Sequence, residues 1–202
     1  MSGSYVDRAC MITTLVALSF CIRNSLEEVT MSAGRIKTAL RKNGIVPDIL
    51  DIYPKHVLQI EYENRKEVQF GNNMTRWDTF EDPVKISYPA DRSAFYTIIM
   101  TDPDCPSREN PKHREWQHWI LVNIPGADWK SGYYLSDYIG ILGYYEEAVH
   151  RYVFILYKQP GKAPLNFTER QLDMRLVSLS SDSLLFFAVY FRPPLCQNKY
   201  LQ

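Results

Sequence analysis

Apolar and polar positions divide the chain into a helical beginning and a strand-rich remainder. A capping pattern at Ser25–Glu28 precedes apolar residues that recur every three or four positions, and Asn43-Gly44 supplies a C-terminal stop. This spacing predicts an amphipathic helix over Leu26–Lys42. Its apolar face is formed by Leu26, Val29, Ala33, Ile36 and Leu40.

Beyond Pro47 the pattern changes to short apolar runs that are typical of β-strands. His56–Tyr62 alternates between apolar and polar residues, which predicts a strand with one buried face. Ala94–Thr101 is continuously apolar, which predicts a buried central strand. The remaining predicted strands are Val84–Tyr88, Trp116–Ile124, Arg151–Tyr157 and Leu184–Phe191.

These runs predict a mainly β fold. No strand is followed by a helical pattern of ~10–15 residues, which disfavours a doubly wound parallel sheet. Short strands separated by glycine, proline and aspartate indicate an antiparallel β-sandwich with an N-terminal helix and a few short peripheral helices. We expect an apolar extension over residues 1–24, the amphipathic helix over 25–44 and the main domain over 45–202.

The N-terminal apolar run bears on localisation. Ala9–Ile22 is too short for a transmembrane helix, which needs ~20 apolar residues, so no transmembrane span is expected. Its length suits the hydrophobic region of a signal peptide. The sequons at Asn73-Met-Thr75 and Asn166-Phe-Thr168 agree with secretion. Secretion to the extracellular space is therefore the expectation, and the alternative is a cytoplasmic protein whose uncleaved run packs on the domain.

Charge and cysteine content remove several classes of function. The 202 residues include 23 Lys+Arg and 23 Asp+Glu, so the chain lacks the basic excess of a strong nucleic-acid binder. No nucleic-acid partner is expected, and the basic residues between 35 and 42 indicate a solvated helix face. The four cysteines include no C-x-x-C pair, which excludes a zinc ribbon and does not suggest a disulfide framework.

The densest group of unusual residues follows the apolar strand that ends at Thr101. Asp102 and Asp104 flank one proline, and Pro106 stiffens the same turn because proline fixes φ near about −65°. A stiff turn that presents carboxylates costs little to organise for binding. In an ordinary turn the aspartates would instead cap backbone N–H groups. His118, on the next predicted strand, favours a binding site.

The chemistry of this group suits a zwitterion such as phosphoethanolamine. Two carboxylates attract an ammonium group, and if they lie close together, repulsion raises the pKa of one so that it donates a hydrogen bond to an anion. Histidine and backbone N–H groups would add donors. A metal site built from Asp102, Asp104, His118 and His150 is the competitor. The His-x-His and His-x-x-x-His spacings of zinc sites are absent, so no metal or other cofactor is expected.

These residues resemble the signature of the phosphatidylethanolamine-binding protein family, which includes the Raf kinase inhibitor proteins and the plant flowering regulators. The signature is a hydrophobic strand, D-P-D-x-P-S, ten residues and a histidine. Here it is Tyr96–Met100, Asp102–Ser107 and His118. A second block matches at Leu135–Gly140 and His150–Tyr157, and Gly44–Asp48 is similar to the start of insect-type members. The resemblance covers about Ile45–Gln159.

The resemblance implies a Greek-key-like antiparallel β-sandwich with a small anion pocket at one end. It implies non-catalytic binding of phosphorylated head groups, such as that of phosphatidylethanolamine, or of other small anions. The alternative that it implies is an inhibitor of a kinase or a serine protease with a degenerate ligand pocket. Carried over by position, the ligand-binding residues are Asp102, Asp104, Pro106, His113, Trp116, His118, His150 and Tyr152.

The chain departs from the family pattern at three places. His113 replaces an aromatic residue, often tyrosine, and would add pH dependence near its usual pKa of ~6.5. Gly140–His150 keeps the family's length but has lost most glycines and both prolines. Because glycine permits close backbone approach, the new apolar side chains are expected to crowd the pocket, and Glu146 and Glu147 to oppose an anion. The C-terminal part has diverged from the family's usual ending.

An enzyme is the third hypothesis, and it would need a nucleophile beside a base. Ser107 lies near Asp104, but the G-x-S-x-G pattern is absent. Cys105 and His118 are conceivable as a thiol pair, although buried cysteine is commonly inert. No catalytic residue is therefore predicted.

Overall fold

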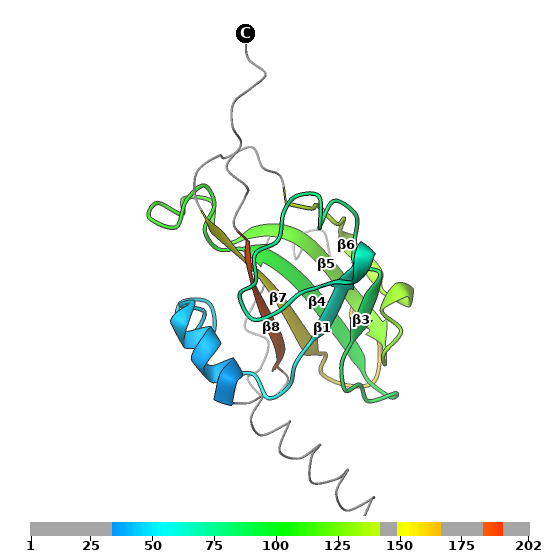
Figure 1. Ribbon diagram of the computed structural model, residues 1–202. Coiled ribbons are helices and arrows are strands. Elements are labelled where there is room, and N and C mark those ends of the chain that lie inside the picture. The colour runs from blue at the N-terminus through cyan, green and yellow to red at the C-terminus, as the bar shows by residue number, and fades with distance from the viewer. Residues whose placement is uncertain (1–33, 142–148, 167–183, 192–202) are drawn as a thin grey trace, which may run out of the picture. The chain divides into compact units, whose positions relative to one another are not determined.

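The computed structural model describes residues 34–141, 149–166 and 184–191 (Figure 1). It divides the chain into two compact units, Met1–Ala39 and Leu40–Gln202. Several predictions lie outside the described residues: the apolar extension, the first part of the predicted helix, most of the altered Gly140–His150 segment and the residues after Phe191.

The predicted helix is confirmed over residues 34–42, where every described residue is helical. Its end has the hydrogen bonds of a Schellman motif. The Gly44 N–H donates to the Arg41 carbonyl at 3.0 Å, and the Ile45 N–H donates to the Leu40 carbonyl at 2.8 Å. Gly44 has a φ of 64°, a left-handed conformation that glycine adopts without steric cost. The glycine stop therefore acts as the sequence predicts.

A five-stranded antiparallel sheet forms the larger β layer of the described residues. Its order is β6-β5-β4-β7-β8 (Figure 1). The three strands that follow one another along the chain, β4, β5 and β6, are neighbours in the sheet. The next strand, β7, returns to lie beside β4, which is the Greek-key arrangement. The strands are β4 (Phe95–Asp102), β5 (Trp116–Pro125), β6 (Tyr133–Ser136), β7 (His150–Lys158) and β8 (Leu184–Phe191).

A smaller antiparallel sheet has the order β2-β1-β3. It consists of β1 (Gln59–Tyr62), β2 (Lys66–Glu67) and β3 (Lys85–Ser87). One 3-10 turn, η1 (Glu63–Arg65), connects β1 to β2, and another, η2 (Trp129–Ser131), lies between β5 and β6 of the large sheet. In β1 the alternation is as predicted, because Ile60 and Tyr62 are buried while Gln59 is exposed.

One hydrophobic core joins the two sheets. Tyr62 and Ile86 from the small sheet belong to the same buried cluster as Ile98, Trp119 and Phe154 from the large one. β4, which lies between β5 and β7 in this sheet, is buried along almost its whole length. The fold is therefore mainly β with antiparallel sheets, as the sequence predicts.

In the part of the chain that the structure describes, no helix is both long enough and apolar enough to cross a membrane.

Candidate functional site

The strand arrangement brings the predicted site residues together where the central strand β4 ends. Asp102 is the last residue of β4, and it pairs with Trp116, the first residue of β5. His150 is the first residue of β7, the other neighbour of β4. Because neighbouring strands are antiparallel, the end of β4 meets the beginnings of β5 and β7.

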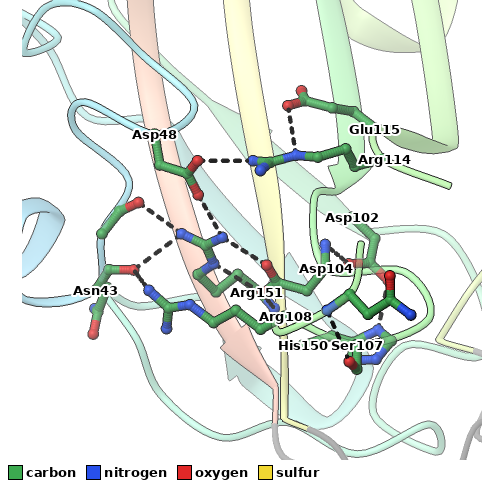
Figure 2. A network of polar contacts seen from close by, with 12 residues as sticks. Asn43, Asp48, Asp102, Asp104, Ser107, Arg108, Arg114, Glu115, His150 and Arg151 are labelled. Atoms are coloured by element: carbon green, nitrogen blue, oxygen red, sulfur yellow. Dashed lines mark hydrogen bonds and ion pairs between the residues drawn. The ribbon is translucent and has the colours of Figure 1, made fainter. Parts of the chain in front are cut away.

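Asp102 and His150 form a buried pair. The Asp102 Oδ2 and the His150 Nδ1 are 2.7 Å apart, and the His150 Nε2 lies 2.9 Å from the Pro106 carbonyl oxygen. The other Asp102 oxygen accepts the backbone N–H of Asp104 at 2.8 Å. The pair therefore ties β4, β7 and the D-P-D loop together (Figure 2).

Asp104 forms a second buried pair, with Arg151. Its Oδ2 accepts hydrogen bonds from the backbone N–H and the Nε of Arg151, both at 2.8 Å, and its Oδ1 accepts one from Nη2 at 2.6 Å. Both side chains are 1% exposed. The sequence suggested that the two carboxylates would influence each other, but the structure pairs each one with its own basic side chain.

Arg151 also reaches the turn after the helix (Figure 2). Its Nη1 donates to the carbonyls of Asn43 and Gly44, at 3.3 and 2.6 Å, and its Nη2 lies 2.7 Å from the Asp48 Oδ2. Burial opposes the charge of Arg151, but the hydrogen bonds to Asp104 and Asp48 outweigh it and raise the pKa of the guanidinium.

Asp48 is shared by two arginines, since Arg114 Nη2 contacts its other oxygen at 3.0 Å. Burial raises the pKa of Asp48, but the hydrogen bonds from Arg151 and Arg114 lower it by more, so the pKa lies below its usual value. Neither Arg151 nor Asp48 is among the ligand-binding residues predicted from the sequence. The available signal was an arginine inside a strand predicted to be buried, where a charged side chain needs a partner.

His118 and Tyr152 form the aromatic part of the site. The His118 Nδ1 lies 2.9 Å from the Ile139 carbonyl, and its ring meets the Tyr152 ring edge-on at a centroid distance of 5.0 Å. The Tyr152 ring is stacked with that of His150 at 6.4 Å. Burial lowers the pKa of His118, although the Ile139 carbonyl partly offsets this. His118 is therefore neutral at neutral pH, with its Nδ1 hydrogen donated to Ile139.

His113 and Trp116 differ from the other predicted ligand-binding residues because they are exposed. The His113 backbone N–H donates to the Cys105 carbonyl at 3.0 Å, and the Trp116 side chain is 47% exposed. Their side chains are not among the groups that hold Asp102 and Asp104 in the described part of the chain. Their roles in binding stay predictions.

The potential nucleophiles are poorly placed for catalysis. Burial, with a smaller contribution from Asp102, raises the pKa of the Cys105 thiol, which disfavours the reactive thiolate. The Ser107 Oγ accepts the Asn110 N–H at 3.3 Å. Within residues 34–141, 149–166 and 184–191, no group of three His, Cys, Asp or Glu side chains is arranged to hold a metal ion.

The fold and the site define an antiparallel β-sandwich with buried, paired charges at the end of a central strand. The family model for phosphatidylethanolamine-binding proteins matches residues 66–182. The chain therefore belongs to the phosphatidylethanolamine-binding protein family.

Individual proteins agree with this assignment. The chain is 34% identical over 139 residues to the Drosophila melanogaster protein named "Putative odorant-binding protein A5", and the match covers 69% of this chain and 65% of that one. Less than two thirds of that relative's length is therefore matched.

Two solved structures share the fold. One is a carboxypeptidase Y inhibitor complexed with its cognate proteinase, with a TM-score of 0.65, 21% identity, and coverage of 80% of this chain and 96% of that one. The other is the phosphatidylethanolamine-binding protein from Plasmodium vivax, with a TM-score of 0.55, 22% identity, and coverage of 77% and 96%.

Proposed function

We propose that this protein binds the phosphorylated head group of a phospholipid, such as phosphoethanolamine, or another small anion, without catalysis. The observation that carries the proposal is that both buried carboxylates are engaged by basic side chains of the protein. Asp102 is paired with His150, and Asp104 is paired with Arg151. Because each carboxylate is engaged in this way, its repulsion of a phosphate is reduced, and the rigid loop costs little to organise.

Binding fits the geometry better than catalysis does. Both oxygens of Asp102 and both oxygens of Asp104 already accept hydrogen bonds from the protein. A general base must direct a lone pair at the proton that it removes, whereas these oxygens are directed at donors of the protein itself. These contacts favour a structural role, in which the carboxylates hold the loop and its basic partners for a ligand.

Calorimetric titration of the full chain with phosphoethanolamine tests the proposal, with inorganic phosphate and ethanolamine as separate titrants. We expect saturable binding of phosphoethanolamine, and loss of affinity by at least about tenfold in His118→Ala. The matched control is His56→Ala, since His56 is exposed and lies before β1. Ethanolamine alone should bind more weakly than either phosphate compound.

Absence of binding of both phosphate compounds to the folded wild-type protein would refute the proposal. Equal affinity of His118→Ala and the wild-type protein for phosphoethanolamine would show that the ligand binds at a different site. Far-ultraviolet circular dichroism of each variant establishes that the compared proteins are folded.

Inhibition of a serine protease or a kinase is the second candidate function, and a surface feature favours it. Trp77, Phe80 and Tyr133 are 71%, 66% and 64% exposed. Exposed aromatic side chains are enriched at protein interfaces. The similar fold of the carboxypeptidase Y inhibitor makes carboxypeptidase Y the first protease to assay. Inhibition that is lost in Trp77→Ala but kept in His118→Ala would separate this function from head-group binding.

A further inference from the structure

His150 is enclosed by hydrogen-bond acceptors on both sides of its ring. Nδ1 is 2.7 Å from a carboxylate oxygen of Asp102, and Nε2 is 2.9 Å from the carbonyl oxygen of Pro106. A carbonyl oxygen only accepts, and an ionised carboxylate only accepts. A neutral imidazole carries one hydrogen and so satisfies only one of these two acceptors.

We propose that His150 is a positioning residue that is held as an imidazolium ion and completes the charge balance of the site. In this form both ring nitrogens donate, one to Asp102 and one to the D-P-D loop at Pro106. The cation therefore connects the first residue of β7 to the end of β4 and to the loop that follows it.

The charged and titratable groups around His150 come from every element at this edge. Asp102 ends β4, Asp104 lies in the loop, His118 is on β5, and Arg151 and Tyr152 are on β7. Burial would lower the pKa of His150, but the hydrogen bond and the charge of Asp102 outweigh it and raise the pKa above its usual value. Asp104 is already neutralised by Arg151.

Deprotonation of His150 would change the site in two ways. A neutral His150 would keep its one hydrogen on Nδ1, toward the Asp102 carboxylate, so the bare Nε2 would face the Pro106 carbonyl oxygen at 2.9 Å, a contact between two acceptors. The four buried charged groups would also go from a net charge of zero to an excess of one negative charge. Both effects weaken anion binding as the pH rises through the pKa of His150. This consequence rests on the proposed function, whereas the charge state of His150 does not.

Nuclear magnetic resonance of the full chain with ¹⁵N-labelled histidines tests the charge state without a ligand. The chain has four histidines, and His56 and His113 are exposed. The variants His56→Gln and His113→Gln therefore assign two signals at little structural risk, and His118→Gln assigns a third. We expect the His150 nitrogens to keep imidazolium shifts to a higher pH than the nitrogens of the exposed histidines, because the Asp102 carboxylate favours the cation.

Asp102→Asn provides the matched perturbation, because it keeps the shape of the side chain and removes its charge. We expect it to bring the midpoint of His150 down toward that of the exposed histidines. If this variant does not fold, the wild-type titration alone decides. A neutral tautomer of His150 at neutral pH, or a midpoint at or below that of His56, would overturn the proposal.

A binding experiment then connects the charge to the ligand. Glycerophosphoethanolamine is a suitable probe, since its phosphodiester keeps a single charge through the neutral range. If the bound probe raises the titration midpoint of His150 by one pH unit, the affinity of the protein for the probe falls about tenfold as His150 deprotonates. Binding that is independent of pH, beside a confirmed imidazolium, would refute the link to affinity and leave the proposed function standing. Absence of binding at every pH would refute the proposed function instead.

Discussion

Arg151 is a residue on which several polar contacts of the site converge. Its guanidinium makes five hydrogen bonds, to Asp104, Asp48 and the carbonyls of Asn43 and Gly44. A planar guanidinium has five N–H donors in a fixed geometry, so this environment fits arginine and no other side chain. One residue thus supports both the D-P-D loop and the turn after the helix.

Arg151→Lys should destabilise the fold although it keeps the charge. A lysine ammonium has three donors from one atom and cannot reproduce the paired contacts with Asp104. We expect a loss of about 2–4 kcal/mol in the free energy of unfolding, measured by urea denaturation, because hydrogen bonds to buried charged groups are lost.

The control for this substitution is Arg92→Lys, because Arg92 is exposed. It should change the free energy of unfolding by less than about 0.5 kcal/mol. If Arg151→Lys were as stable as Arg92→Lys, the converging contacts would not contribute to stability.

The sequence identified Asp102, Asp104, His118 and His150, but not how their charges are paired. The spacing of residues along a chain predicts that they reach one edge of a sheet. It does not predict which cation faces which carboxylate, since that depends on backbone conformation in the loop and on side-chain torsions. Arg151 and Asp48, which are 103 residues apart, illustrate this limit.

His118 is bonded to the segment 138–141, which in turn packs closely against Thr79. Its Nδ1 and its backbone carbonyl both bond to Ile139, at 2.9 and 2.7 Å. The next residue, Gly140, passes so close to the Thr79 carbonyl that a Cβ atom at this position would collide with it. Tyr138 donates to the same carbonyl at 2.9 Å. The close approach of 138–141 to Thr79 therefore fixes the segment that orients His118.

Gly140→Ala should disturb this contact. The added methyl group would meet backbone atoms of Thr79 and Phe80, which cannot rotate away. We expect a destabilisation of about 1–3 kcal/mol in urea denaturation, the usual cost of overpacking. Gly34→Ala is the control, because nothing lies within 4 Å of a Cβ atom there. A Gly140→Ala protein as stable as this control would contradict the close approach.

The long strands and the short strand β3 were predicted to within one residue at each end, whereas β2 and β6 were not predicted. The prediction of β5 differs from the structure by one residue, and that of β7 by one residue at each end, because both are long apolar runs. β2 has two residues and β6 has exposed and half-buried side chains, so neither has a periodic pattern that a sequence reveals. The predicted first strand begins later, at Gln59, since His56 lies in a bend and Val57 forms only an isolated bridge.

The order of the strands along the chain places the site. The D-P-D loop connects β4 to β5, and β7 returns to the other side of β4. Residues that are far apart in sequence therefore meet where β4 ends. The resemblance to a known family predicted this arrangement, whereas hydrophobic periodicity alone gave antiparallel strands without their order.

The most direct test of head-group binding is a map of the residues that respond to phosphoethanolamine. Backbone amide signals of the full chain would be followed by heteronuclear magnetic resonance during the titration. We predict that the largest saturable shifts fall in residues 102–107, 116–118 and 150–152. Saturable shifts confined to other residues, or no shifts at all, would contradict the assignment of this buried charged site as the ligand-binding site.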